Sequence, residues 1–210
     1  MIETPTRPSP GEKPDFSGPG NLGRLTYLVV DDDDLSRRTF TKFLSHLGAS
    51  NVIEAGSAGQ ALALIAAHKI DVLIGDLMMP DIAGDEFVWC LRRNPNGRLR
   101  RLPVVMISAY HDEKHMMAAR DAGVDEFVAK PCSLGDFYFY VRRAVTEPRS
   151  FVVAPSGVHS HDTSGYIGPD RRRKDMGAPE GRERRALAVR ANLPSPAEAG
   201  FAKAGPHAQR

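Results

Sequence analysis

The chain alternates short apolar runs with amphipathic helical segments, and this alternation limits its fold more than any other feature. Residues 27–30 form a β-branched apolar run that is too short for a buried helix, and four aspartates follow it directly. Residues 35–47 then have apolar side chains at helical spacing. Asp33 or Asp34 is placed to cap this helix and Gly48 to end it. A strand followed by a helix is the basic unit of an α/β sheet.

The same unit recurs four more times before residue 146. The expected strands are 51–54, 70–75, 103–107 and 124–129, and the expected helices are 57–68, 85–93, 113–122 and 133–145. Nearly continuous apolar strands separated by helices predict a parallel sheet with both faces covered. In an open sheet of this kind, functional residues gather at the carboxyl ends of the strands.

Composition divides the chain into three parts. Residues 1–23 contain five prolines and no apolar segment, which predicts a flexible leader and not a secretory signal. Residues 24–146 hold all five strand–helix units. Residues 147–210 are rich in Gly, Pro and Arg, which predicts a mostly disordered tail with one short apolar run at 151–153. The tail also carries most of the excess positive charge.

Several classes of protein are not expected. There are only two cysteines, without a Cys-x-x-Cys pair, so neither a disulfide scaffold nor a zinc site is expected and a reducing cytoplasm is the default location. There is no run of 18 apolar residues, so no membrane span is expected.

Four of the five expected strands end in polar residues whose chemistry fits together. These residues are Asp31 and Asp32 on the first strand, Asp76 on the third, Ser108 on the fourth and Lys130 on the fifth. Each one alone is ordinary as a turn or capping residue. Together, at one edge of one sheet, three carboxylates, a hydroxyl and an ammonium group indicate a phosphoryl-transfer site.

The chemistry assigns a role to each group. Carboxylates that lie close together repel one another unless a cation compensates them, and Mg²⁺ prefers oxygen ligands of this kind. Asp76 stands alone after a buried strand and is the candidate nucleophile, which would form an aspartyl phosphate. Asp31 and Asp32 are the candidate metal ligands. Lys130 and Ser108 would bind the phosphoryl oxygens.

These segments resemble the receiver domain of bacterial two-component response regulators, over about residues 25–146. The motifs that carry the resemblance are 28–33, 73–80, Gly84, 105–109 and Lys130-Pro131. The resemblance implies a flavodoxin-like (βα)5 doubly wound parallel sheet of strand order 2-1-3-4-5. It also implies a cis peptide bond between Lys130 and Pro131.

The resemblance further implies that a histidine kinase or a histidine phosphotransfer protein phosphorylates Asp76. Mg²⁺ would be held by Asp31, Asp32, Asp76 and the backbone carbonyl of Met78. Ser108 and Phe127 would move together on activation, and because Phe127 lacks a hydroxyl its movement would be steric only. Such a chain is not an enzyme beyond accepting the phosphoryl group and losing it slowly.

Two side chains flank the expected path of the water that hydrolyses the phosphoryl group. Met78 lies two residues after the phosphoacceptor and Tyr110 two residues after Ser108. Neither is a carboxylate or an amide that orients water well. The sequence therefore predicts a slowly hydrolysed aspartyl phosphate that lasts minutes to hours.

The last helix contains four consecutive aromatic residues, 137–140, which cannot all face the core. Two interpretations stay open: a hydrophobic helix with no binding role, or a surface that binds a partner or a second copy of the chain.

The tail repeats a short pattern, Gly-x-acid-Arg-Arg. The candidate anion-binding residues in it are Arg171, Arg172, Arg173, Arg184 and Arg185. They indicate either a solvated basic tail or a docking peptide. Only one weak helix is visible there, so a DNA-binding output domain and contact with nucleic acid are not expected.

We therefore predict a phosphoryl-accepting switch or relay intermediate that signals through a downstream protein. The alternative is a transcription or RNA-binding regulator that uses the tail arginines. A haloacid-dehalogenase-like phosphatase is disfavoured, because Met78, and not an acid, lies two residues after Asp76.

Overall fold

A five-stranded parallel sheet forms the centre of the molecule in the computed structural model, which describes residues 22–110, 112–147, 150–153 and 159–162. The strands are β1 (Thr26–Val30), β2 (Asn51–Ala55), β3 (Val72–Asp76), β4 (Val104–Ser108) and β5 (Glu126–Ala129). Their order is β2-β1-β3-β4-β5, and every neighbouring pair is parallel. The predicted order is confirmed.

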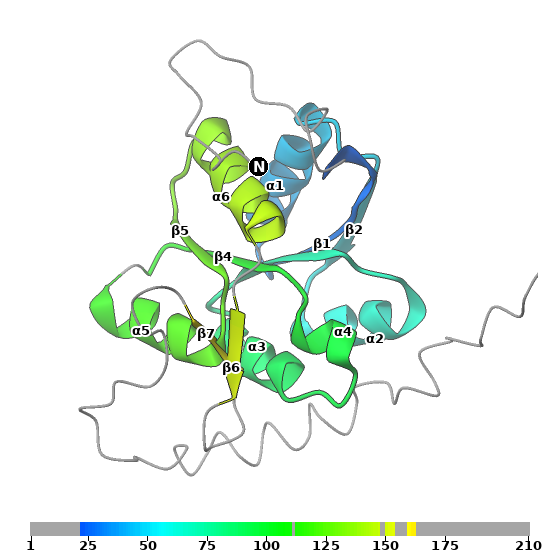
Figure 1. Cartoon of the computed structure of the whole chain (residues 1–210). Coiled ribbons are helices and arrows are strands. Elements are labelled where there is room, and N and C mark those ends of the chain that lie inside the picture. The colour runs from blue at the N-terminus through cyan, green and yellow to red at the C-terminus, as the bar shows by residue number, and fades with distance from the viewer. Residues whose placement is uncertain (1–21, 111, 148–149, 154–158, 163–210) are drawn as a thin grey trace, which may run out of the picture.

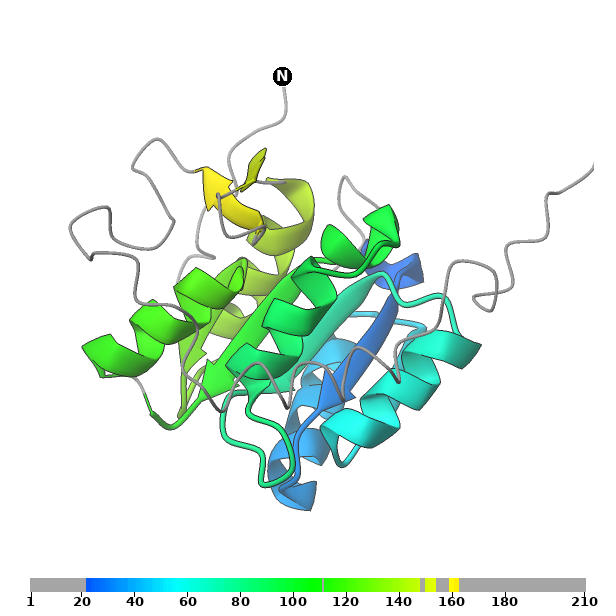
Figure 2. The same cartoon turned by 90° about the horizontal axis from the view of Figure 1, so that it is seen from below.

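Helices cover both faces of the sheet. They are α1 (Asp34–His46), α2 (Ala58–Ala67), α3 (Gly84–Arg92), α4 (Gly97–Arg100), α5 (Glu113–Ala122) and α6 (Leu134–Thr146). Figure 1 shows α1 and α6 on one face and the other helices on the opposite face, and Figure 2 shows α2, α3 and α5 lying across that second face. The doubly wound architecture follows from strands that are apolar on both sides.

Alternate residues of the strands supply two separate cores. On β1, Tyr27 and Val29 face α1 and α6, where they join Phe40 and Phe137. Leu28 and Val30 point to the opposite face of the sheet, into the core that α2, α3 and α5 cover. Successive side chains of a strand point to opposite faces, so an unbroken apolar run is what a sheet covered on both sides requires.

Side-chain caps begin most of the helices at the positions that the sequence indicates. Asp33, and not Asp34, caps α1, because its carboxylate accepts a hydrogen bond from the Ser36 N–H at 2.8 Å. Ser57 caps α2 in the same way. Gly123, with a φ of +93°, ends α5 in the left-handed conformation that glycine adopts without strain.

Three elements differ from the sequence-based expectation. A short 3-10 helix, Leu22–Arg24, lies partly within the expected leader, and the backbone carbonyl of its buried Leu22 accepts a hydrogen bond from the Tyr27 hydroxyl. Helix α4 follows the expected stop, because the Asn96 side chain caps a new turn. Strand β6 (Ser150–Val153) covers the expected apolar run, but it pairs antiparallel with β7 (His159–Asp162), which the sequence pattern did not indicate.

Other predictions fall outside the described residues. These are the flexible leader over residues 1–21 and the five tail arginines, Arg171, Arg172, Arg173, Arg184 and Arg185.

The aromatic run on α6 divides between core and surface. Phe137 and Tyr138 are buried, whereas Phe139 and Tyr140 are partly exposed. The Arg143 guanidinium lies 5.2 Å from the centroid of each of the two exposed rings, and it also pairs with the buried Glu126 of β5. The exposed aromatic surface is therefore partly covered by an arginine of the same helix.

A fully buried arginine ties together the end of the sheet that lies away from the strand-end aspartates. Arg92, the last residue of α3, donates to the backbone carbonyls of Gly123 (2.9 Å), Arg100 (3.1 Å) and Leu102 (2.7 Å) and to the Asp125 carboxylate (2.8 Å). Burial lowers the pKa of Arg92, and the Asp125 charge opposes that shift. The charge is tolerated there because both the Coulombic partner and the hydrogen-bond acceptors are in place.

None of the helices in the described part of the chain combines the length and the apolar character that crossing a bilayer requires.

Candidate functional site

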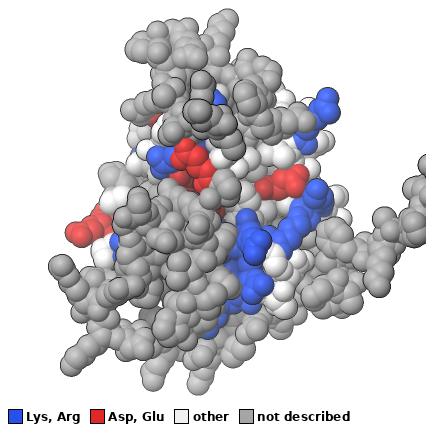
Figure 3. All heavy atoms as spheres, in the orientation of Figure 1, with Lys and Arg blue, Asp and Glu red and all other residues white. Residues whose placement is uncertain are grey.

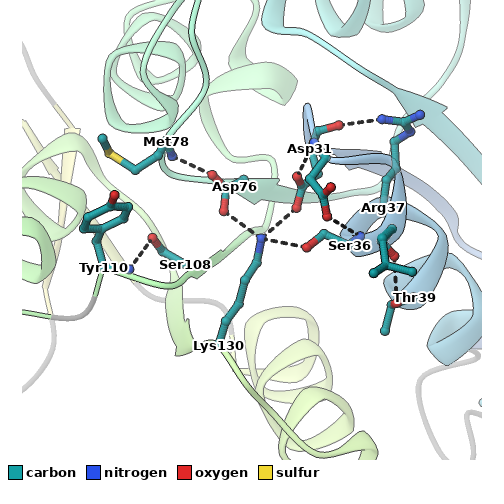
Figure 4. Close-up of polar contacts among 11 residues, drawn as sticks. Asp31, Ser36, Arg37, Thr39, Asp76, Met78, Ser108, Tyr110 and Lys130 are labelled. Carbon is teal, nitrogen blue, oxygen red and sulfur yellow. Dashed lines mark hydrogen bonds and ion pairs between the residues drawn. The ribbon is translucent and has the colours of Figure 1, made fainter.

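The carboxyl ends of three strands bring two aspartates and a lysine into direct contact. Asp31 follows β1, Asp76 ends the neighbouring β3, and Lys130 follows β5. The Lys130 Nζ lies 2.8 Å from Asp31 Oδ2 and 2.9 Å from Asp76 Oδ1, so one ammonium group bridges both carboxylates. Figure 4 shows this bridge at the centre of the site.

Burial sets the electrostatics of this cluster. Asp31 and Asp76 are 3% and 7% exposed. Burial raises the pKa of Asp31, and the hydrogen bond and charge of Lys130 act against that shift. Burial alone would lower the pKa of Lys130, but its hydrogen bonds to Asp31 and Asp76 outweigh that effect and raise it. The lysine therefore stays cationic and offsets the repulsion between two desolvated carboxylates.

The third predicted metal ligand is not part of this contact. Asp32 is adjacent to Asp31 in the chain, but its side chain is exposed. Within the described ranges, no three His, Cys, Asp or Glu side chains are gathered closely enough to form a metal-binding group. The donor set still fits a hard cation, since Asp31 and Asp76 present buried carboxylate oxygens that need positive charge.

Backbone groups of the β3–α3 loop also reach Asp76. The Met78 N–H donates to Asp76 Oδ2 at 2.7 Å, so each carboxylate oxygen of Asp76 has its own donor. The Met78 side chain is 45% exposed. The backbone that was predicted to bind metal thus lies beside the predicted phosphoacceptor.

Ser108 and Tyr110 lie on the side of Asp76 that faces away from Asp31, as Figure 4 shows. Ser108 is fully buried, and its hydroxyl oxygen accepts a hydrogen bond from the Tyr110 N–H at 3.0 Å. The Lys130 N–H donates to the Ser108 carbonyl at 2.8 Å, which ties the β4 end to the lysine. Tyr110 is 52% exposed, so Tyr110 and Met78 are both accessible to solvent next to Asp76.

Phe127 lies on β5 opposite Met106 of β4. It is partly buried against the core that α2, α3 and α5 share with the sheet. The Lys130-Pro131 peptide bond is cis, as the resemblance implies.

Helix α1 contributes two residues that the sequence reasoning missed. Lys130 Nζ donates to the Ser36 hydroxyl at 3.2 Å, and the Arg37 guanidinium donates to the Asp31 backbone carbonyl at 2.7 Å. Arg37 also pairs with Asp34 and Glu54. Because α1 begins directly after the aspartate run, its first turn must face the same edge of the sheet. That proximity was the available signal.

A glycine allows the next helix to approach Asp76 closely. A Cβ added to Gly84, the first residue of α3, would come closer than 3.0 Å to the Asp76 carbonyl oxygen and to the Met106 side chain. The Gly84 N–H donates to the Leu77 carbonyl at 2.8 Å. Gly84 therefore lets α3 start against the backbone that carries the candidate phosphoacceptor.

A hollow of about 240 Å³ opens beside Lys130, between the first turns of α1 and the loop after β5. Apolar side chains form much of its wall, including Leu35, Phe43 and Pro131. Leu35 is 75% exposed, although it is a large apolar residue. Cys132 also lines the hollow, and burial raises the pKa of its thiol.

Comparison with known proteins decides the family of this fold and site. The family model of the response regulator receiver domain matches residues 27–142, more than half of the chain. The chain belongs to the response regulator receiver family. The predicted family is thereby confirmed, and with it the assignment to two-component signalling. The family is not, in general, one of classical enzymes.

Three curated relatives are similar to this receiver over its folded part. The chemotaxis protein CheY of Pseudomonas aeruginosa is 34% identical over 107 residues, which are 51% of this chain and 85% of CheY. The transcriptional regulatory protein KdpE of Escherichia coli is 34% identical over 121 residues, 58% of this chain and 52% of KdpE. The cyclic di-GMP phosphodiesterase of Thermotoga maritima is 33% identical over 111 residues, 52% of this chain and 28% of the phosphodiesterase. This chain thus spans only about half of KdpE and less than a third of the phosphodiesterase.

Solved structures confirm the flavodoxin-like fold of the receiver. A putative response regulator from Chloroflexus aurantiacus has a TM-score of 0.55 and 30% identity, and the match covers 58% of this chain and 98% of that one. CheY4 of Vibrio cholerae has a TM-score of 0.54 and 24% identity, with the same two coverages.

The close approach at Gly84 leads to a stability prediction. We expect Gly84→Ala to lower the free energy of unfolding by about 1–3 kcal/mol, because the new methyl group must displace the Asp76 backbone or Met106. Chemical denaturation with both proteins under the same conditions measures this difference. Gly59→Ala is the matched control: a Cβ there meets only the Ser57 hydroxyl at 3.9 Å, and alanine favours the helix by up to about 1 kcal/mol. Equal effects of the two substitutions would contradict the role given to Gly84.

Proposed function

We propose that this chain is a phosphoryl-accepting switch in which Asp76 takes a phosphoryl group from a phosphohistidine on a histidine kinase or a histidine phosphotransfer protein. The observation that carries the proposal is the Lys130 ammonium group held between two buried carboxylates, Asp31 and Asp76. Perturbed, desolvated charges in such an arrangement are typical of sites built for chemistry.

Asp76 is the acceptor because its carboxylate is positioned from both sides. Lys130 Nζ contacts one oxygen and the Met78 N–H contacts the other. In the transfer, a carboxylate oxygen of Asp76 forms a bond to phosphorus while the bond from phosphorus to the donor imidazole nitrogen breaks. The donor histidine leaves as a neutral imidazole once its ring is protonated. Lys130 is then placed to pair with a phosphoryl oxygen.

Mg²⁺ would be held by Asp31, Asp32, Asp76 and the Met78 backbone carbonyl, where it would offset the negative charge of the phosphoryl group. The Ser108 oxygen already accepts from Tyr110, so its own proton is left to donate to a phosphoryl oxygen.

The switch would run through the pairing of β4 with β5. Ser108 lies opposite Ala129 in that pair, and Phe127 lies two residues earlier on the same strand. If Ser108 moved toward the phosphoryl group, the backbone of the paired strand β5 would move with it, and Phe127 would change position. The surface that this movement rearranges would contact a downstream protein. The partly exposed aromatic residues of α6 are a candidate surface for a homodimer.

We place the phosphoryl-accepting activity in the cytoplasm.

The hollow beside Lys130 supports a protein as the phosphodonor. Its apolar wall and the exposed Leu35 offer a contact surface next to the acceptor carboxylate. A partner that covers this surface would bring its phosphohistidine to Asp76 and exclude water from the transfer.

The first prediction from this proposal concerns the covalent product. Incubation of the full chain with acetyl phosphate and Mg²⁺ should add the mass of one phosphoryl group, read by intact-protein mass spectrometry. Asp76→Asn should gain no such mass, because an amide is not a nucleophile for phosphorus. Asp81→Asn, which alters an exposed carboxylate of the same loop, should gain it as the wild type does. Equal gains in the wild type and Asp76→Asn, or none in either, would refute the proposal.

The second prediction concerns the lifetime of the phosphorylated protein. After removal of the phosphodonor, the phosphoryl group should decay over minutes to hours, since neither Met78 nor Tyr110 orients water. Met78→Glu should hasten decay roughly tenfold, which is less than the contribution of a fully aligned general base. Met116→Glu is the matched control, because Met116 is 43% exposed and lies on α5. A wild-type half-life of seconds, or the same acceleration by Met116→Glu, would show that Met78 does not set the rate.

A further inference from the structure

Four arginines gather on the surface of α3 and α4, at some distance from the phosphoryl site. Residues 87–111 contain five arginines and no Asp, Glu or Lys. Arg92 is buried, and the other four are at least partly exposed. They form what we call the α3–α4 arginine patch: Arg93, Arg98, Arg100 and Arg101. Figure 3 shows basic side chains collected over this part of the molecule.

Hydrogen bonds from the buried Arg92 fix the backbone that carries this patch. The buried Arg92 donates to the carbonyl of Arg100 at 3.1 Å and to that of Leu102 at 2.7 Å, so the loop between α3 and β4 is fixed on both sides of Arg101. Arg98 donates to the Ile70 carbonyl and lies 3.6 Å from Asp71. A patch on such a rigid base loses little conformational entropy when it binds a partner.

An aromatic residue extends the patch on α3. The Arg93 guanidinium lies 4.2 Å from the centroid of the Trp89 ring, which is itself partly exposed. Trp and Arg are the residue types that most often dominate the energetics of protein–protein interfaces. Arg also binds carboxylates through two parallel hydrogen bonds, which Lys cannot do.

We propose that the α3–α4 arginine patch is a docking surface for an acidic segment of a protein partner. The distribution of charge favours an acidic protein segment over a nucleic acid as the ligand of this patch. The patch carries four guanidinium groups, one of which, that of Arg98, already lies 3.6 Å from the Asp71 carboxylate. The receiver around the patch, residues 24–145, has 15 basic and 16 acidic residues, so it has no general attraction for a long polyanion. A short run of carboxylates matches the excess of positive charge that this cluster of guanidinium groups keeps beside the single carboxylate of Asp71.

Lipid is the poorer match for the same surface. The large apolar residues that are exposed in the described part of the chain are Leu35, Met78, Tyr110 and Met116, and none of them lies on α3 or α4. Anionic lipid is usually held by basic residues together with apolar side chains that enter the bilayer. The patch has the basic residues, but its one apolar contribution is Trp89, which is only partly exposed and lies under the Arg93 guanidinium.

The patch lies at the opposite end of the sheet from Asp76. Helix α4 directly precedes β4, so it lies at the amino end of that strand, whereas Ser108 ends β4 on the side of the phosphoryl site. Docking there leaves the site open to the phosphodonor. The proposal is thus independent of the phosphotransfer activity, and its test does not require phosphorylation.

Binding of a fluorescein-labelled octaglutamate peptide to the full chain, followed by fluorescence anisotropy, tests the proposal. Arg100→Glu combined with Arg101→Glu should weaken binding by about tenfold or more, since like charges then face the probe. Arg38→Glu combined with Lys42→Glu makes the same change of net charge on the exposed side of α1 and should leave binding within about twofold of the wild type. Thermal unfolding of both double variants verifies that they are folded.

Wild-type affinity in the patch variant, or an equal loss in the α1 variant, would overturn the proposal, because binding would then depend on net charge or on other arginines of the chain. A single-stranded oligonucleotide of the same charge provides the second arm. If it binds more tightly than the peptide and the patch variant abolishes that binding, the patch serves nucleic acid and the assignment to a protein partner is wrong.

Discussion

The contact of the Lys130 ammonium with the carboxylates of Asp31 and Asp76 is the interaction on which the rest of the site depends. Two carboxylates this deeply buried would repel each other if no cation lay between them. A buried ion pair adds little net stability, because the cost of desolvation offsets the Coulombic gain. The arrangement is therefore best explained by what it does: it holds a positive charge against the Asp76 carboxylate.

The fold supplies this contact by bringing together residues that are far apart in the sequence. Lys130 is 99 residues from Asp31 and 54 from Asp76, and only a parallel sheet with β1 beside β3 joins their strand ends at one edge. Close packing then fixes the details. Gly84 lets α3 begin against the Asp76 backbone, and Arg37 of α1 binds the carbonyl of Asp31. The same sheet also keeps the phosphoryl site apart from the proposed docking surface, because the α3–α4 arginine patch lies at the other end of the strands.

The sequence predicted the parts of the structure that depend on periodicity and on strand ends. Five apolar runs, each followed by a helical pattern, were enough for the sheet and its two cores, and the placement of Asp31, Asp76, Ser108 and Lys130 follows from the strand ends alone. Side-chain hydrogen bonds between residues far apart in the sequence were not predictable. Arg92 looks like an ordinary surface residue at the end of a helix, yet it is buried and donates to three backbone carbonyls of two other segments. Helix α4 was missed because Asn96 both ends one turn and caps the next. Ser36 was missed because its partner Lys130 lies 94 residues away.

The position of the phosphoryl group on the chain is the most direct test of the proposed switch. The full chain is treated with acetyl phosphate and Mg²⁺, the acyl phosphate is reduced with borohydride to the corresponding alcohol, and the modified residue is located by peptide mapping. Our interpretation predicts homoserine at Asp76, with Asp31 and Asp32 recovered unchanged. Modification at Asp31 or Asp32, or an unmodified Asp76 in a chain that has gained a phosphoryl group, would contradict it.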